Sequence, residues 1–414
     1  MKFIHIADLH LGKSIYGTSM IENGDQSYWV NKFIELATAE APQAVVIAGD
    51  VFDRKDPGED AVALFSHLMS SLHELRIPVL TIAGNHDSIY RLSYVRPVLA
   101  EQDLIFSRSL TENSELEHLN LQDEHGKVTF WLMPYVFPAL IARALGNDEL
   151  RDYKTAVTKL LEAQGIDTSQ RNVLIAHQNV TCNGKEAERG GSESMIGGVG
   201  QIDYHTFDDF DYVALGHIHA AYSVGRKSVR YAGSPLCYHF DETKQPDKGP
   251  LIVEIGAKGE PISIKPAIIE PLHRMVPIKG EYEKICEDEL ARNGRDEYIS
   301  ITLTDRRITP EIASFFRDLY KSRGSVLMEL KSEFRHFTDN MQTIAEGREK
   351  KSASELFSDF YTERRGGRPP ESEEYKIMDF AGELMQSAGD FHEEPDQKTI
   401  DKFLDFLLGM EGEE

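Results

Sequence analysis

Cysteine is scarce, long apolar runs are absent, and basic residues are outnumbered. Only three cysteines occur among 414 residues, Cys182, Cys237 and Cys286, and no two of them form a CxxC pair. A sparse, odd set of this kind suits a reducing compartment, so we expect a cytoplasmic protein whose cysteines only pack. No stretch of about 18 apolar residues appears, which excludes a membrane-spanning helix. The opening residues MKFIHIADLHLG lack the apolar core of a signal peptide.

Positive charge is in short supply, because 45 Lys and Arg face 69 Asp and Glu, for a formal net charge of −24. Such a chain does not hold a nucleic acid by bulk electrostatics. Part of the excess of acidic residues lies in residues 380–414. Bound divalent cations would reverse the sign at a site. A chain of this charge that acts on nucleic acid therefore needs cations, and a partner subunit that supplies positive surface.

β-Branched runs that end in polar or glycine-containing turns recur through the first 265 residues. Examples are FIHIAD, AVVIAGD, PVLTIAGNHD, NVLIAHQ and DYVALGHIH. Continuous apolar runs are typical of strands buried on both faces. Helix-like segments at 29–39 and 60–75 separate the early runs. This order predicts an α/β domain over residues 1–265, in which stacked β-sheets are flanked by helices.

A second unit begins near Pro271. Its segments alternate, with strands expected at 274–278, 298–304 and 325–330 and helices at 282–292 and 310–322. Pro310 stands where a first helical turn tolerates proline, directly after the expected cap Thr309. The pattern predicts a small α/β domain over residues 270–335.

Residues 336–414 are polar and charged, and short helices are predicted within them. Ser352 and Glu355 have the spacing of a capping box. An apolar stripe at helical spacing follows, made by Leu356, Phe357, Phe360 and Tyr361. The stripe either packs on its own chain or docks on a partner, and the sequence leaves both interpretations open.

Side chains that bind metal ions stand at five predicted strand ends. They are Asp8 with His10, Asp50 with Asp53, Asn85 with His86 and Asp87, His177, and His217 with His219. The spacing of Asp8 and His10, and of His217 and His219, points both members of a pair to one side. Ligands collect at the carboxyl ends of strands in open α/β sheets, so the five segments are expected to converge on one crevice.

Oxygen and nitrogen donors without thiolates suit Mn, Fe or Zn, and Mn matches this mixture of hard and borderline ligands. Two ions roughly 3.5–4 Å apart need a bridging carboxylate, for which Asp50 is the natural candidate. Such a pair holds a hydroxide at neutral pH and clamps a phosphoryl group. His86, next to Asn85, is then free to meet the leaving oxygen. A lone histidine after a strand is usually structural, but an ordered set at five strand ends is hard to produce by chance.

The motifs DLH at 8–10, GDVFD at 49–53, GNHD at 84–87, AHQ at 176–178 and GHIH at 216–219 resemble the signature of calcineurin-like metallophosphoesterases. Together with YAGSPL at 231–236, the exact residues of these motifs resemble those of the SbcD family of nuclease subunits. The resemblance implies two stacked mixed β-sheets flanked by helices. It also implies a Mn²⁺-dependent exonuclease on double-stranded DNA and endonuclease on hairpins and single strands, serving DNA repair, recombination and replication.

The resemblance assigns roles by position. Asp8, His10, Asp50 and His219 would hold one metal ion, and Asp50, Asn85, His177 and His217 the other. His86 would be the catalytic histidine, while Asp53 and Asp87 would orient the ligands from behind. Some relatives carry a further histidine just after the GD motif, where this chain has Val51, Phe52 and Asp53, so His86 is the main candidate proton donor.

The same resemblance implies DNA as substrate and an SbcC-type, SMC-like ATPase as partner. The stripe of Leu356, Phe357, Phe360 and Tyr361 would dock on the coiled-coil base of that ATPase. The small α/β domain would cap the site and select duplex ends by shape. The sequence leaves open whether the chain forms a homodimer. Candidates for phosphate contacts near the motifs are Lys13, Tyr16, Arg54, Lys55 and Arg91.

Three other functions compete with this interpretation. GDVFDR also resembles the GDxxDRG motif of phosphoprotein phosphatases, so a calcineurin-like protein or small-molecule phosphatase is the alternative, although Lys55 stands where that motif has glycine. Residues 12–14 (GKS) imitate the end of a P-loop, but Asp8 and His10 would stand where phosphates sit. A non-catalytic scaffold would have no need for Asn85 and His86 together.

Overall fold

The computed structural model describes residues 1–93, 96–110, 114–182, 184, 200–245 and 248–334. They all belong to the first of two compact units, Met1–Phe334. The predicted tail at 336–414, with its stripe of Leu356, Phe357, Phe360 and Tyr361, lies outside the described residues. In the part of the chain that is described, no helix has both the length and the apolar character needed to cross a membrane.

Six strands form the first sheet, in the spatial order β15-β14-β1-β4-β5-β6. Their bounds are Lys2–Ile6 (β1), Ala44–Ala48 (β4), Val79–Ile82 (β5), Leu104–Phe106 (β6), Leu251–Glu254 (β14) and Ser263–Pro266 (β15). Strands β1, β4, β5 and β6 are parallel, whereas β14 runs antiparallel to β1 and β15 antiparallel to β14. The sheet is therefore mixed.

Five strands form the second sheet, in the order β13-β12-β9-β8-β7. Their bounds are Glu117–Asp123 (β7), Gly126–Met133 (β8), Arg171–His177 (β9), Tyr212–Gly216 (β12) and Val229–Tyr231 (β13). All are parallel except β7, which forms an antiparallel pair with β8. This sheet is mixed as well, and the predicted fold class is confirmed.

The two sheets share one apolar layer because their strands alternate cleanly between two buried faces. In β4, Val46 and Ala48 face the layer between the sheets, whereas Val45 and Ile47 face the helices. Strand β9 alternates in the same way between that layer and the core on its other side. Every residue of β4 and β9 is buried, as continuous apolar runs predict.

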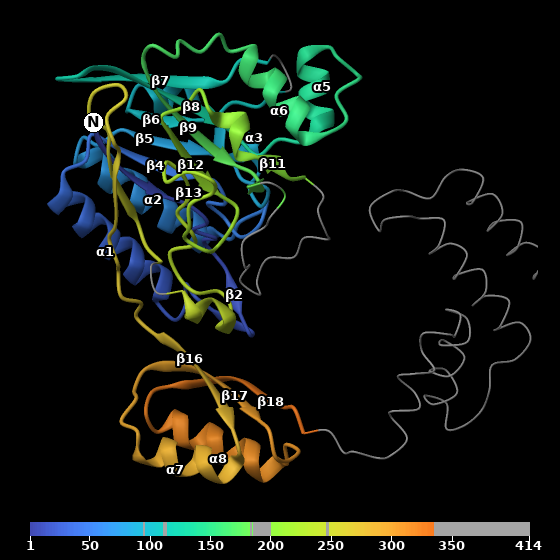
Figure 1. The fold of residues 1–414 in the computed structure, drawn as a ribbon. Helices are drawn as coiled ribbons and strands as arrows, with labels where there is room; N and C mark the ends of the chain where they lie inside the picture. Colours follow the sequence, from blue (N-terminus) through green and yellow to red (C-terminus); the bar gives the residue numbers. More distant parts are fainter. Residues whose placement is uncertain (94–95, 111–113, 183, 185–199, 246–247, 335–414) are drawn as a thin grey trace, which may run out of the picture. The chain divides into compact units, whose positions relative to one another are not determined.

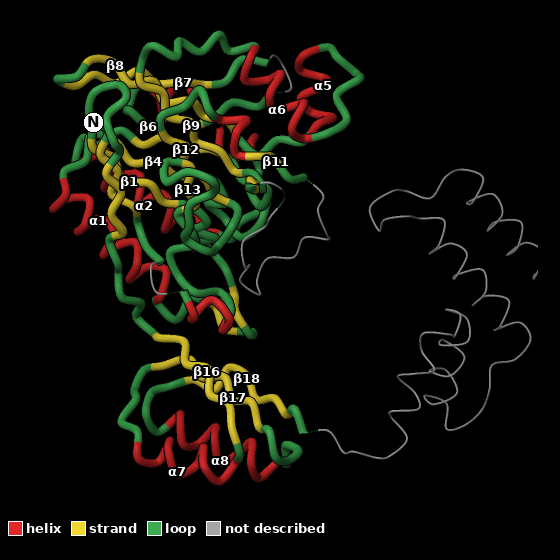
Figure 2. Tube along the Cα trace, viewed as in Figure 1, coloured by secondary structure: helices red, strands yellow, loops and turns green. Residues whose placement is uncertain are grey.

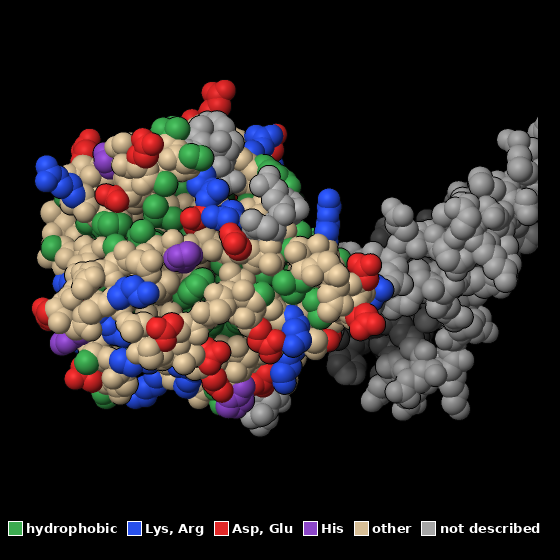
Figure 3. Space-filling view, turned by 90° about the horizontal axis from the view of Figure 1, so that it is seen from above, with side chains coloured by type: hydrophobic (Ala, Val, Ile, Leu, Met, Phe, Trp, Pro, Cys, Tyr) green, Lys and Arg blue, Asp and Glu red, His purple; other side chains and the backbone are tan. Residues whose placement is uncertain are grey.

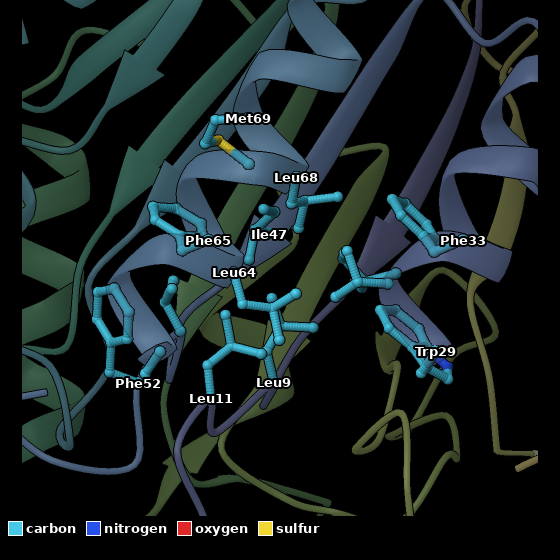
Figure 4. Packing of buried hydrophobic residues seen from close by; sticks show 14 of the residues in the cluster. Leu9, Leu11, Trp29, Phe33, Ile47, Phe52, Leu64, Phe65, Leu68 and Met69 are labelled. Carbon is cyan, nitrogen blue, oxygen red and sulfur yellow. The ribbon is translucent and has the colours of Figure 1, made fainter. Parts of the chain in front are cut away.

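Helices cover the outer face of each sheet (Figures 1 and 2). Helices α1 (Asp25–Glu40) and α2 (Glu59–Glu74) pack on the first sheet, and α5 (Pro138–Leu145) and α6 (Tyr153–Glu162) on the second. Figure 4 shows Trp29 and Phe33 of α1 and Leu64, Phe65, Leu68 and Met69 of α2 gathered around Ile47 of β4. The Trp29 and Phe33 rings are stacked with centroids 5.3 Å apart.

Short elements complete this part of the chain. They are β2 (Ser14–Ile15), β3 (Thr18–Ser19), α3 (Ile89–Ser93), α4 (Arg96–Ala100), β10 (Val180–Thr181), β11 (Ile202–Asp203), and the 3₁₀ helices η1 (Tyr204–Phe207) and η2 (Phe240–Lys244). Strands β2 and β3 form an antiparallel pair directly after the DLH segment.

A third, separate sheet follows, in which β16, β17 and β18 are parallel. Its elements are β16 (Arg274–Gly280), α7 (Tyr282–Ala291), β17 (Glu297–Leu303), α8 (Pro310–Lys321) and β18 (Val326–Ser332), in the predicted order. Thr309 caps α8, because its side chain accepts a hydrogen bond from the backbone N–H of Ile312. The sheet and its two helices have a core of their own around Ile299, Ile301 and Phe316.

Candidate metal centre

The predicted ligands all follow strands whose carboxyl ends meet at one edge of the two sheets. Asp8 and His10 follow β1, Asp50 follows β4, Asn85 and His86 follow β5, His177 ends β9, and His217 and His219 follow β12. Five of these residues are at most 4% exposed: Asp8, His10, Asp50, His177 and His219. Asn85, His86 and His217 are half-buried, on the open side of the cluster. The structure thus brings the five segments together.

The first group of donors surrounds His10. Its Nε2 lies 3.2 Å from Nε2 of His219 and 3.5 Å from Oδ2 of Asp50. Asp8, His10 and His219 each offer a ligand atom within 4.8 Å of the others. Two imidazole nitrogens that face each other at this distance can share a cation, and a nearby carboxylate balances its charge.

The second group surrounds Asn85. Its Oδ1 lies 3.1 Å from Nε2 of His177 and 3.1 Å from Nδ1 of His217. Oδ2 of Asp50 lies 3.3 Å from the same nitrogen of His177. One carboxylate oxygen of Asp50 is therefore close to both groups, which is the position that a bridging ligand requires. The donor chemistry and the convergence fit a pair of divalent cations.

Four of these residues have left-handed backbone conformations, although none is glycine. The φ angles are 55° at Asp8, 42° at His10, 48° at Asp50 and 98° at His217. Such angles cost roughly 1–3 kcal/mol each and persist only where the surroundings impose them. The backbone N–H of Asp8 donates to the carbonyl of Gly49 at 3.0 Å, and that of His10 donates to the carbonyl of Asp50 at 2.9 Å. The DLH loop and the GDVFD loop therefore hold each other in strained conformations. These conformations direct the side chains of Asp8, His10 and Asp50 toward the site.

Gly84 allows the GNHD loop to approach Asp50. A Cβ at this position would lie 2.1 Å from Oδ1 and 2.4 Å from the backbone nitrogen of Asp50. Gly84→Ala is therefore expected to displace the Asp50 carboxylate, weaken metal binding and lower the free energy of unfolding by about 1–3 kcal/mol. Urea unfolding and metal titration measure both effects. Gly280→Ala is the matched control, because its Cβ would make an ordinary 3.5 Å contact with Ile285. Equal behaviour of the two variants would contradict the prediction.

His86 is held at the edge of the cluster by two contacts. Its backbone N–H donates to Oδ1 of Asp50 at 2.9 Å, and its Nδ1 lies 3.0 Å from the carbonyl oxygen of Asp53. Because a carbonyl only accepts, Nδ1 carries a proton, and Nε2 is the nitrogen left for exchange. His86 also offers an atom within 4.8 Å of His10 and Asp50, so its position suits a ligand as well as a proton donor.

Asp87 and Asp53 brace the loops. The Asp87 carboxylate accepts backbone hydrogen bonds from Val51 at 3.1 Å, Phe52 at 2.9 Å and Gly84 at 2.9 Å, and so joins the GDVFD and GNHD segments. Oδ1 of Asp53 lies 3.4 Å from Nδ1 of His10 and accepts from the Lys13 ammonium at 2.7 Å. Lys13 thus supports the loops rather than standing clear for a phosphate.

Charges in the cluster shift its pKa values in opposite directions. Burial lowers the pKa of His177, but the charge and hydrogen bond of Asp50, together with the charge of Asp8 and the carbonyl of Ala48, raise this pKa to about 9. Burial likewise opposes ionisation of Asp50, yet His177 and His10 hold its pKa well below the ordinary value. Burial lowers the pKa of His219 to about 4, so its ring is neutral at pH 7. A neutral ring is the form that binds metal, and a cation must displace the proton on His177.

A buried ion pair behind His219 was not predicted from the sequence. Oε1 of Glu242 lies 3.4 Å from Nδ1 of His219, and its other oxygen accepts from the backbone of Tyr238 at 3.1 Å and from the Lys248 ammonium. Tyr238 in turn donates its hydroxyl to the carbonyl of Leu9 at 2.6 Å. The 238–248 segment therefore orients His219 and tethers the DLH loop. The only signal in the sequence was the charged DETK stretch, which is usually solvated.

Glu242→Gln is expected to weaken metal binding by about 10–100-fold, because His219 loses the carboxylate that orients its ring. It also leaves the buried Lys248 ammonium without its charge partner, which costs about 3–5 kcal/mol of unfolding free energy. Calorimetric metal titration and urea unfolding separate the two effects. A Glu242→Leu/Lys248→Met double variant should regain stability but not metal affinity. Recovery of both, or loss of neither in the single variant, would contradict this role.

Comparison with known proteins decides the family. A family model described as calcineurin-like phosphoesterase matches residues 1–221. The SbcD subunit of nuclease SbcCD from Staphylococcus saprophyticus is 33% identical over 306 residues, which cover 73% of this chain and 78% of the relative. The chain belongs to the calcineurin-like phosphoesterases, in the SbcD family. Membership supports a metal-dependent hydrolase and confirms the resemblance inferred from the motifs.

Three further comparisons match parts of this SbcD-family chain. The SbcD subunit of nuclease SbcCD from Staphylococcus epidermidis is 30% identical over 308 residues, covering 74% of this chain and 79% of the relative. A model described as type 5 capsule protein repressor C-terminal domain matches residues 271–365, which include the third sheet. The crystal structure of TT1561 of Thermus thermophilus aligns at 12% identity over 56% of this chain and 89% of that chain, with a TM-score of 0.35. This score is too low to bear on function.

Proposed function

We propose that this chain is a nuclease that hydrolyses phosphodiester bonds of DNA with two divalent cations, Mn²⁺ by preference. It would act as an exonuclease on duplex ends and as an endonuclease on hairpins and single strands, in DNA repair, recombination and replication. The observation that carries the proposal is the convergence of donors from five strand ends on Asp50. Its support is that both SbcD-family relatives are named as subunits of nuclease SbcCD.

The two donor groups would divide the ions between them. Asp8, His10, Asp50 and His219 would hold one, and Asn85, His177 and His217 would hold the other together with Asp50. Bound ions of this kind polarise a phosphoryl oxygen and provide a deprotonated water as nucleophile near neutral pH. Support comes from the distances of 3.1–3.5 Å that join the donors within and between the groups.

His86 would deliver a proton to the leaving oxygen. Its Nδ1 proton is directed to the carbonyl of Asp53, so the proton for the leaving oxygen would come from Nε2 of a doubly protonated ring. Its backbone N–H donates to Asp50, and this contact would fix the position of the ring relative to the two metal ions. Asp53 and Asp87 would act only as positioning residues, since one holds His10 and the other joins the two loops.

Charge argues for a partner on the DNA-binding side. The net charge is −24, and among the described residues on the face in Figure 3, basic and acidic side chains are interspersed. An SbcC-type ATPase of the SMC-like class would supply the positive surface, with the stripe of Leu356, Phe357, Phe360 and Tyr361 as the docking segment. Residues 1–265 would form the nuclease domain, residues 270–335 the cap that selects duplex ends, and residues 336–414 the linker and docking tail.

Cleavage of labelled DNA by the full chain tests the proposal. After chelation and dialysis, the chain should leave a blunt duplex and a hairpin intact, and added Mn²⁺ should restore cleavage of both. Hydrolysis of p-nitrophenyl phosphate should remain far slower than DNA cleavage. Rapid hydrolysis of that monoester with both DNA substrates intact would favour the phosphatase alternative and refute the nuclease.

A further inference from the structure

Aromatic side chains line the open side of the second donor group. The loop after β8 reaches the same sheet edge as His177, because β8 runs parallel to β9. The ring of Tyr135 in this loop lies 6.4 Å from the His177 ring and 6.3 Å from the His217 ring, measured between centroids. Phe137 lies two residues further along the same loop and directly precedes α5.

A groove opens at Phe137, whose side chain is 45% exposed. Its volume is about 520 Å³, and its lining combines apolar and aromatic surface with a few polar groups: Phe137, Pro138, Ala139, Ala142, Asp148, Leu150, Arg151 and Tyr153. Tyr153 hydrogen-bonds with Tyr135, and burial together with this neighbour raises the pKa of the Tyr153 phenol. Through Tyr153, the groove borders Tyr135, whose ring lies beside the rings of the candidate ligands His177 and His217.

We propose that this groove binds a nucleobase next to the scissile phosphate, with Phe137 as the stacking surface. This inference rests on the proposed nuclease function and names the part of the substrate that the site holds beside the ions. Every base has a π face, so stacking on an aromatic ring does not depend on sequence. Stacking also does not depend on net charge, so it is a suitable source of affinity for a chain whose formal net charge is −24. The Arg151 guanidinium adds one positive group to the groove.

The shape of the interaction restricts the substrate. A base reaches an aromatic pocket only after it leaves the duplex stack, at a cost of a few kcal/mol that is lowest for unpaired nucleotides. Frayed ends, hairpin loops and single strands therefore present a base to Phe137 more readily than internal duplex does. The groove accordingly gives residues 1–265 their own preference for DNA ends and unpaired DNA segments.

Two single strands of equal length and label test the proposal with the full-length chain in Mn²⁺. One carries thymine throughout, and the other carries base-free tetrahydrofuran sugars on the same phosphates. The wild-type chain should have a KM about 5- to 100-fold lower for the thymine strand. Phe137→Ala should bring the two KM values within about twofold of each other while kcat on the base-free strand is unchanged. Phe137→Tyr should retain the preference, because it keeps the π face.

Phe334→Ala is the matched control, since this phenylalanine is 37% exposed and follows the third sheet. It should retain the full preference for thymine. Equal KM values for both strands in the wild-type chain, or an unchanged preference in Phe137→Ala, would overturn the nucleobase site while the nuclease function stands. A wild-type chain that cleaves neither strand would refute the nuclease function and this inference together.

Discussion

Asp50→Asn is expected to lower metal-dependent DNA cleavage by at least about 10³-fold, with the fold intact. Oδ2 of Asp50 lies 3.5 Å from the His10 donor and 3.3 Å from the His177 donor, so a neutral amide weakens both proposed ion sites at once. Asparagine keeps the shape and the oxygen that accepts the backbone hydrogen bond of His86. Initial rates on a labelled duplex, together with metal content per chain, measure the effect.

Asp318→Asn is the control for the same chemical change, because Asp318 lies on α8 outside the donor cluster. It should leave both rate and metal content unchanged. Full metal content and a near-normal rate in Asp50→Asn would show that this carboxylate does not link the two ions.

His86→Gln is expected to lower the cleavage rate by about 10²–10⁴-fold while two ions per chain and DNA affinity are retained. Glutamine is similar to histidine in length and polarity but cannot exchange a proton. Single-turnover cleavage, metal analysis and DNA binding separate the three properties. His205→Gln is the matched control, since His205 is exposed and pairs with Asp208.

The two roles that the geometry permits for His86 give different outcomes. Loss of one ion in His86→Gln would make His86 a ligand, in line with its proximity to His10 and Asp50. Loss of DNA binding with normal cleavage would exclude it as the proton donor.

The strand ends that deliver the donors were predictable because they are local patterns. Continuous apolar runs predict strands buried on both faces, and β4 and β9 are buried along their whole length. The order of short motifs then predicts which ends meet, because parallel neighbours carry their carboxyl ends to one edge. Alternating periodicity likewise predicted the strands and helices from β16 to β18.

Contacts that depend on tertiary packing could not be predicted. Glu242 and Lys248 look like solvated charges in sequence, and only the folded loop buries them behind His219. Lys13 looked available for a phosphate, but the turn after β1 brings it to Asp53. The left-handed conformations of Asp8 and Asp50 are also unexpected for non-glycine residues, since intrinsic preference disfavours them and loop contacts impose them.

Anomalous diffraction from crystals of this chain soaked in Mn²⁺ tests the central claim most directly. Two peaks roughly 3.5–4 Å apart are expected, with Asp50 bound to both. One should contact Asp8, His10 and His219, and the other Asn85, His177 and His217. A single peak, or two peaks of which neither contacts Asp50, would contradict the two-metal centre on which the proposed nuclease depends.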